Sequence, residues 1–461
     1  MKRMLQRRNS YAGLVSGRKG QLRKPWLYSD RVLPRLVVRP LERFLHREAG
    51  SAGFLMVMAA AALVWSNVWP RSYEELWSTV LTVDLGLVAI SEDARHWIND
   101  LLMAVFFYVV SLEIKRELLF GSLRSARTAA APVAAAVGTM VGAALTYLAV
   151  NLIMDGDLRG WAIPIATDIA FAIGVLGLVG RRAPRELRAF MLTLAVVDDL
   201  ATIAVIGAVF SQGFSLRWLI AAALLAGVVF LAQRIGIRSL VVYVLLAGAV
   251  WLAVFESGVH ATIAGVVLGF LTPAVAFHGR RSARETIAQT LDVSNPDAEL
   301  RERALLDTAT VARESVSPLA RMEDRLHPWS AFLVLPLFAL ANAGVPVSAD
   351  GVGEALTSPV GVGIATGLVV GAPIGGLIFA LALVRTGAAR VPEGLDWPAI
   401  SAVAPLKGIG FTVAIFISTL AFDEVVLQNE AKLAILFASA AAAVIGIGAL
   451  LLRHATTRRS A

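Results

Sequence analysis

Long apolar stretches recur along the whole chain, and they constrain its fold more than any other feature. Each holds about 17–25 residues, the length that an α-helix needs to cross the hydrocarbon core of a bilayer. A lone strand would leave its backbone polar groups unpaired in lipid, so helices are expected. Twelve spans are predicted, at 52–70, 97–120, 128–153, 161–180, 188–210, 214–233, 239–255, 258–276, 328–346, 359–384, 397–422 and 429–453. The fold class is therefore an all-α membrane protein.

The composition supports a membrane environment. Of the 461 residues, 57% are hydrophobic and only 16% are charged, too few to cover the surface of a soluble chain of this length. The absence of cysteine excludes a disulfide framework, a thiolate nucleophile and a thiolate-bound metal. No histidine pair has the spacing of a zinc-protease helix. We expect neither an enzyme nor a bound cofactor.

The basic residues predict the orientation of the spans. All but six of the 42 Lys and Arg residues fall on one side if the N-terminus is cytoplasmic, the exceptions being Arg71, Arg95, Arg159, Arg217, Lys432 and, within a span, Lys407. Basic residues favour the cytoplasmic side of a membrane, so both termini are predicted to be cytoplasmic in a multi-pass protein of the cell (inner) membrane. The net charge of +8 therefore indicates topology, with some attraction to anionic lipid, rather than nucleic-acid binding.

The chain is predicted to have three parts. A basic cytoplasmic tail covers 1–51 and lacks the apolar core of a cleaved signal peptide. The membrane domain covers 52–455 and includes a long, charged cytoplasmic loop at 278–327, and a short tail covers 456–461.

Two segments outside the spans have their own predicted structure. Leu76–Ser91 partly alternates apolar and polar residues and is rich in β-branched residues, which favours a small external β-hairpin. The charged run after Asn295-Pro296-Asp297 indicates a surface helix.

A few ionisable residues lie deep in the apolar spans. They are Asp168 in WAIPIATDIAFAIG, Asp198 and Asp199 in LTLAVVDDLATIAV, and Lys407 in SAVAPLKGIGFTVAIF. Asp199 is roughly 16 Å from either end of its span, too far for its side chain to reach the surface. Charges in this position are expensive, so each is a candidate functional residue. Adjacent residues on a helix project about 100° apart, so one carboxylate of the pair can face an ion cavity while the other meets a neighbouring helix.

Structural roles are the alternative for some of these groups. Asp168 alone could be a hydrogen-bond acceptor that holds a broken helix in place. Glu113, Lys115, Arg116 and Glu117 could mark a helix end at the headgroups, where neighbouring charges partly neutralise one another. Two adjacent carboxylates deep in an apolar helix have no packing value, so a structural role for them is disfavoured.

Two of the spans are predicted to be interrupted. Pro164 precedes Thr167-Asp168 in one, and Pro405 precedes Gly408 and Gly410 in the other, combinations that break the helical hydrogen-bond ladder. Interrupted spans in the two halves of a transporter indicate a midplane binding site. An Asp near one break and a Lys near the other would balance the partial charges of the half-helix ends.

These residues suggest a mechanism. Burial and a neighbouring carboxylate both disfavour ionisation, so the Asp198–Asp199 pair can hold protons near neutral pH or release them and hold a cation. A site with only oxygen ligands suits Na⁺ or Li⁺. Competition between H⁺ and Na⁺ for the same oxygens is sufficient for antiport.

At these residues the sequence resembles the NhaA family of bacterial sodium/proton antiporters. The resemblance runs from about Ala52 to the end of the last span, through the segments WINDLLMAVFFYVVSLEIKREL (97–118), IPIATDIAFAIG (163–174), VVDDL (196–200), SGVHATIAGV (257–266), LHPWSAFLVLPLFALANAGV (326–345) and KGIGFTVAIFI (407–417). It implies an inverted-repeat fold in which spans 4 and 11 cross as extended chains.

The resemblance also implies the roles of particular residues. The ion site would be Asp198 and Asp199, with Thr167 and Asp168 at the crossing. A homodimer that contacts through the external hairpin is also implied. The family has a cytoplasmic cluster associated with pH activation, and Glu113, Arg116 and Glu117 match that cluster in this sequence.

One position departs from the family pattern. The family usually has a lysine in a Gly-Lys-Pro motif of span 10, and here the motif is Gly371-Ala372-Pro373. Lys407 lies in span 11, where the family usually has no charge. Our hypothesis is that Lys407 replaces the missing cation and pairs with Asp168 or Asp198.

Other functions remain alternatives at this stage. A sodium-coupled symporter for an organic anion would need a larger polar cavity. An intramembrane aspartyl protease would need two carboxylates on opposite sides of a scissile bond, which adjacent residues of one helix do not provide. A channel-like protein that has lost antiport along with the span 10 lysine is a third alternative.

Overall fold

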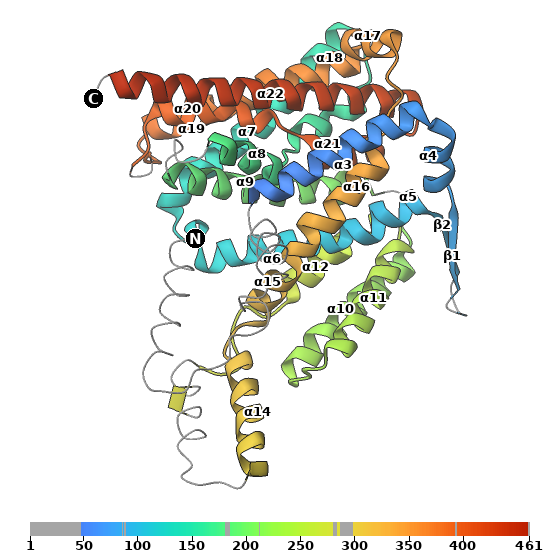
Figure 1. Ribbon diagram of the computed structural model, residues 1–461, viewed down its shortest axis with the longest axis vertical. Helices are drawn as coiled ribbons and strands as arrows, with labels where there is room; N and C mark the ends of the chain where they lie inside the picture. The colour runs from blue at the N-terminus through green and yellow to red at the C-terminus, as the bar shows by residue number, and fades with distance from the viewer. Residues whose placement is uncertain are drawn as a thin grey trace, which may run out of the picture. The chain divides into compact units, whose positions relative to one another are not determined.

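A computed structural model describes residues 48–459 except 85, 87–88, 180–184, 212, 280–283, 286–297 and 392–393 (Figure 1). The described residues belong to one compact unit, which begins at Glu48. The predicted basic tail therefore lies almost wholly outside the described residues. Part of the 278–327 loop and the last residues of the 456–461 tail are outside them too.

Within the described residues, seven continuous helical segments are long and apolar enough to cross a membrane. They are α3 (Glu48–Val68), α5–η3–α6 (Ala94–Trp97, Ile98–Leu102 and Met103–Phe120), α7 (Ala126–Ile153), α9 (Arg185–Val209), α10 (Leu216–Arg234), α18–η8–α19 (Pro359–Thr366, Gly367–Gly371 and Ala372–Arg385) and α22 (Val425–Arg459). α22 continues six residues beyond the predicted end of the last span at 453.

Two further segments pass the same test as bent pairs of helices, which brings the number to nine over the part of the chain that is described. The first pair is η5 (Leu158–Ile165) with α8 (Ile169–Val179), and the second is α20–η9 (Trp397–Val403 and Ala404–Gly408) with α21 (Phe411–Ala421). Three more predicted spans correspond to shorter helices: α11 (Leu240–Phe255), α12 (Thr262–Leu271), and η7–α16 (Ser330–Val334 and Leu335–Asn342). The protein is thus mostly helical, and the count of twelve spans stays a prediction.

The exposed surface of the helix pair α10 and α11 fits a lipid environment. The two helices lie side by side in Figure 1. Leu216, Leu224, Val241 and Leu245 are each more than 60% exposed. Apolar surface on this scale is unusual on a soluble monomer and marks contact with a membrane or a partner.

Small residues allow close helix packing between α7 and α19. A Cβ added at Gly142 would lie 2.8 Å from the Cα of Gly375, so the two backbones approach too closely for larger side chains. Interfaces of this kind are typical of helices in membranes, where close packing replaces the hydrophobic effect. They hold the elements around the site in fixed positions.

The predicted β-hairpin is present. Strands β1 (Val80–Asp84) and β2 (Ala89–Asp93) pair antiparallel, with Val80 opposite Asp93. The turn contains Gly86, whose φ of 79° favours glycine. The start of the predicted segment belongs instead to a short helix, α4 (Pro70–Trp77), because Pro70 at its first position favours helix initiation.

The predicted surface helix in the cytoplasmic loop is α14 (Ala298–Glu314), which is followed by α15 (Pro318–Trp329). Glu314 at the end of α14 forms ion pairs with Arg238 and with His278. These residues come from the α10–α11 connection and from the segment after α12, so Glu314 ties three parts of the chain together. Short elements η4 (Ser122–Arg124) and α17 (Ala349–Thr357) complete the fold.

Candidate ion-binding site

Two interrupted segments meet in the middle of the helix bundle. η5 contains Pro164 and ends at Ile165, after which the backbone is extended before α8 begins. η9 contains Pro405 and is followed by extended Ile409 before α21. Each pair is bent by 43°. The backbone N–H of Asp168 donates to the carbonyl of Ile409 at 2.7 Å, so the two breaks contact each other directly.

The side chain of Asp168 binds the N-terminal turns of two helices. Its Oδ1 accepts from the N–H of Phe171 at 3.0 Å in the first turn of α8. Its Oδ2 accepts from the N–H of Thr412 at 3.2 Å and from the Thr412 hydroxyl at 2.5 Å, in the first turn of α21. The N-terminus of a helix carries partial positive charge and unpaired N–H groups, so a carboxylate there is stabilised. Asp168 therefore holds the two broken segments together.

Asp198, Lys407 and Thr167 form a buried cluster beside this junction. The Lys407 ammonium forms an ion pair with Oδ2 of Asp198 and also donates to the Thr167 hydroxyl at 2.8 Å. The Thr167 hydroxyl donates to the same Oδ2 at 3.1 Å. Asp198 is 0% and Lys407 is 4% exposed, so neither charge is solvated by bulk water. Of the two partners considered for Lys407, the structure places it on Asp198.

One oxygen of this cluster has no partner. Oδ1 of Asp198 is buried and accepts no hydrogen bond from the residues that the structure describes. An unsatisfied buried carboxylate oxygen is costly, and such atoms call for an explanation such as an ion or water. The free oxygen is therefore a natural ligand position for a small cation.

Asp199 has a different environment from Asp198. It is half-buried on α9 rather than fully buried, and its carboxylate makes no hydrogen bond with the part of the chain that is described. Its electrostatic neighbours include Asp198 and Glu113 of α6. The adjacent aspartates thus differ in their surroundings, as their spacing on a helix allows: one is bound to Lys407, and the other has Glu113 among its electrostatic neighbours.

The charged turn at the end of α6 contacts α15. Arg116 forms an ion pair with Glu323, and His327 lies 3.8 Å from Glu113. Burial raises the pKa of Glu323 above its usual value, and the nearby Arg116 partly offsets this effect. The turn is therefore linked to the element that follows the charged loop.

Glu117 has a separate set of partners. Its carboxylate accepts from the backbone N–H of Ser122 at 2.6 Å and from the Ser122 hydroxyl at 2.5 Å. That hydroxyl also lies 2.6 Å from the hydroxyl of Thr193 on α9. Glu117 thus connects the end of α6 to the helix that carries the two aspartates.

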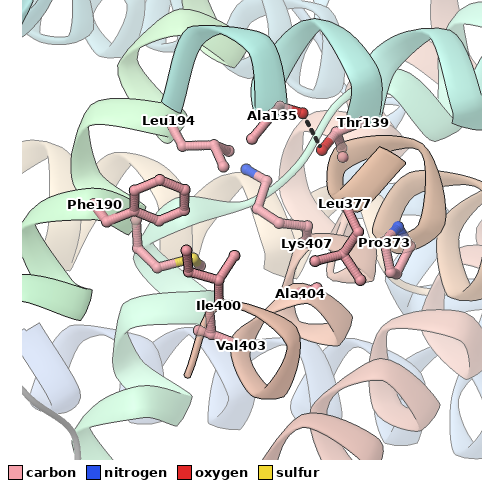
Figure 2. Close-up of a pocket in the computed structure, with 12 residues that line it drawn as sticks. Ala135, Thr139, Phe190, Leu194, Pro373, Leu377, Ile400, Val403, Ala404 and Lys407 are labelled. Atoms are coloured by element: carbon pink, nitrogen blue, oxygen red, sulfur yellow. Dashed lines mark hydrogen bonds between the residues drawn. The ribbon is translucent and has the colours of Figure 1, made fainter. Parts of the chain in front are cut away.

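Ala372 occupies the position of the missing lysine. It is the first residue of α19 and is fully buried. The next residue, Pro373, lines a small cavity that Lys407 also lines (Figure 2). The cation of this chain and the position of the family's usual cation therefore lie close together.

Two residues of the site were missed in the sequence. Thr412 binds Asp168 from α21, and Lys115 donates to the carbonyls of Phe270 at 2.6 Å and Thr272 at 2.7 Å, at the end of α12. Thr412 lies two residues after Gly410 in the interrupted span, which is the signal that could have found it. Lys115 was treated only as part of the charged helix end.

Chemically, the cluster can exchange one bound cation for another. Carboxylate and hydroxyl oxygens are hard ligands that suit Na⁺ or Li⁺. Among the described residues, no group of three or more His, Asp or Glu side chains gathers as a metal site, so the candidate ligands are limited to two aspartates and nearby hydroxyl and carbonyl oxygens. A weak site of this type fits a cation that binds and leaves.

The fold and this cluster define a multi-pass helical membrane protein with a buried charged site between two interrupted segments. The family model described as Na⁺/H⁺ antiporter 1 matches residues 42–450. The Na⁺/H⁺ antiporter NhaA of Rhodopirellula baltica is 41% identical over 419 residues, which cover 90% of this chain and 94% of that protein. The Na⁺/H⁺ antiporter NhaA 2 of Myxococcus xanthus is 43% identical over 425 residues, covering 90% and 89%. The chain belongs to the Na⁺/H⁺ antiporter 1 family, and the resemblance found in its sequence is confirmed.

Proposed function

We propose that this protein exchanges cytoplasmic Na⁺ or Li⁺ for external H⁺ across the cell (inner) membrane. The observation that carries the proposal is the buried cluster in which Lys407 and Thr167 share one oxygen of Asp198 while the other oxygen is free. The relatives named above are Na⁺/H⁺ antiporters, which supports the same function.

In this proposal, protons and Na⁺ compete for one set of oxygens. Half-buried Asp199 receives the incoming cation, and Asp198 completes its coordination with help from Thr167. A bound Na⁺ takes the place of the Lys407 ammonium on Asp198, and Lys407 then gives up its proton. The Lys407 ammonium and Na⁺ each bring one positive charge to Asp198, so the net charge of the site is the same in both states, which permits the change between inward-open and outward-open states.

Lys407 takes the role of the cation that the family usually has at the position of Ala372. A cation is needed because Asp198 is fully buried, and an unpaired buried carboxylate is strongly disfavoured. Asp168 is the positioning residue that keeps the two broken segments in contact. An inverted repeat, with these segments crossing at its centre, is the architecture that we propose for alternating access.

Three further features belong to the proposal. Glu113, Arg116 and Glu117 regulate exchange with pH, since their turn connects the cytoplasmic α15 to the aspartates. Both termini are cytoplasmic, and the basic tail attracts anionic lipid. The protein is a homodimer that contacts through the β-hairpin, whose Leu81 is 49% exposed. A Leu81→Asp variant that keeps the mass of the dimer in detergent would count against this interface.

The organic-anion symporter is disfavoured by the geometry. Within the described residues, the cavity beside Lys407 has walls that are mostly apolar and room for only a water-sized group. An organic anion would need a larger cavity with several polar contacts.

Proteoliposomes containing a pH-sensitive dye provide the test. Adding Na⁺ or Li⁺ on one side should drive proton movement in the opposite direction, whereas K⁺ should not. A requirement for an organic anion would instead support symport, and a Na⁺ flux without proton movement would support a channel.

A further inference from the structure

A small cavity adjoins Lys407. It lies between α7, α9, α19 and the α20–η9 segment. Figure 2 shows the Lys407 side chain running between Phe190 and Leu377, with Leu194 and Thr139 nearby. Its walls are mostly apolar, and it has room for a water-sized group.

The cavity is close to Asp198. Phe190, Leu194 and Asp198 are spaced four residues apart on α9, so their side chains project from one face of the helix. Two of the three line the cavity, and Leu194 is one turn, or about 6 Å, from Asp198. Lys407 both lines the cavity and binds Asp198, so the cavity is within reach of the Lys407 side chain.

The cavity contains a polar group that suits an amine. The Thr139 hydroxyl is buried and donates its hydrogen to the carbonyl of Ala135 at 2.9 Å. A hydroxyl has one hydrogen and two lone pairs, so this oxygen is still able to accept a hydrogen bond. Gly376 leaves that oxygen uncovered, because a Cβ at this position would lie 2.7 Å from the Thr139 Oγ1.

We propose that Thr139 is the second partner of Lys407: when Na⁺ binds Asp198, the Lys407 amine turns into the cavity and donates to the Thr139 hydroxyl. This inference rests on the proposed exchange function. Na⁺ on the free Oδ1 and the ammonium on Oδ2 would place two cations on one buried carboxylate, where they repel each other strongly, so the amine is displaced. The displaced amine needs a buried acceptor because an unpaired buried N–H is disfavoured. Thr139 is thus a positioning residue that stabilises the Na⁺-bound state.

The first test compares Thr139→Val with Thr139→Ser. Valine keeps the shape but removes the acceptor, and we expect it to raise the apparent KM for Na⁺ about three- to tenfold, the effect of one hydrogen bond, with little change in the maximal rate. Serine keeps the acceptor and should behave like the parent protein. Gly376→Ala, which covers the Thr139 oxygen, should change KM in the same direction as valine. Val137→Ala, at an exposed site on the same helix, is the matched control.

The second test repeats Thr139→Val in a Lys407→Ala background. Without the Lys407 amine, no N–H donates a hydrogen bond to the Thr139 hydroxyl, so Thr139→Val should no longer weaken Na⁺ binding. Binding is followed as the Na⁺-dependent rise in melting temperature in detergent, which requires no transport. An equal loss in both backgrounds, or no effect in the parent, would overturn the role of Thr139. Absence of both exchange and Na⁺-dependent stabilisation in the parent protein would instead overturn the proposed function.

Discussion

Lys407 and Asp198 form a buried ion pair that joins the interrupted α20–α21 segment to α9. The pair is completed by the Thr167 hydroxyl, which comes from the other interrupted segment. All three elements of the candidate site therefore meet at one carboxylate oxygen. This arrangement places the cation that pairs with Asp198 on η9, within the interrupted α20–α21 segment.

Replacing Lys407 with Ala should reduce Na⁺-driven proton exchange. Removing one member of a buried ion pair costs about 3–5 kcal/mol because the other charge is left unpaired. Since about 1.4 kcal/mol corresponds to a factor of ten, we expect a loss of tenfold or more, or a marked shift of the pH profile. The exchange rate in proteoliposomes across a range of pH measures the effect.

Adding Ala372→Lys to the Lys407→Ala variant should partly restore exchange. Ala372 is buried next to Pro373, which shares the cavity with Lys407, so removal of the native lysine leaves space for the new one. Ala372→Lys alone is the control and should impair exchange, because it adds a second buried cation. An unchanged rate and pH profile in Lys407→Ala itself would reject the role of this residue.

Replacing Asp168 should mainly affect stability. Its carboxylate accepts hydrogen bonds from Phe171 on α8 and from Thr412 on α21, and hydrogen bonds to charged groups contribute about 1.5–3 kcal/mol each. We expect Asp168→Ala to lower the melting temperature in detergent more than Thr412→Val, which removes only one hydrogen bond. Asp168→Asn keeps a partial acceptor and should be intermediate. If Asp168→Ala melts like the parent protein, the residue does not hold the junction.

The sequence was sufficient to predict a mostly helical membrane protein, whereas the roles of the predicted site residues stay a prediction. Apolar length predicts helices directly, and Pro164 and Pro405 indicate the breaks because they remove backbone donors. The β-hairpin was also predicted, from its β-branched residues, although its start was placed too early. These features depend on local sequence, which is why they were accessible.

Features that depend on tertiary contact were not predicted. The choice of Asp198 over Asp168 as the partner of Lys407 depends on how the two breaks meet, and no local pattern encodes that. The same is true of Arg116, whose partner Glu323 is 207 residues away. The exact number of spans is equally hard to predict, because short helices such as α12 have only 10 residues although the apolar stretch around them is longer.

Glu323 should make stability depend on pH in a specific direction. Burial raises its pKa above the usual 4.5, so the folded protein binds its proton more tightly than the unfolded chain does. The contribution of Glu323 to stability is therefore fully present below about pH 4.5, and it is lost as the pH rises through the raised pKa of the folded state. We expect the difference in melting temperature, parent minus Glu323→Gln, to decrease as the pH rises through this window and then to level off.

The matched control for this measurement is Asp324→Asn, since Asp324 is exposed on the same helix. Its difference from the parent should be small and nearly constant with pH. A parent-to-Glu323→Gln difference that instead grows as the pH rises would mean that the ion pair with Arg116 outweighs burial in the folded state.

Replacing Glu314 should release α14 while leaving exchange intact. The Glu314 side chain is only 10% exposed and pairs with both Arg238 and His278. Loss of the carboxylate in Glu314→Ala leaves Arg238 and His278 without this acceptor, so the helix should open more often and its amides should exchange faster with deuterium. Asp307→Ala, at an exposed site on the same helix, should not have this effect. Because the ion site is built from other elements, Na⁺-driven proton exchange should stay within about twofold of the parent. A large loss of exchange together with faster deuteration would instead show that α14 supports transport and is more than a solvated insertion.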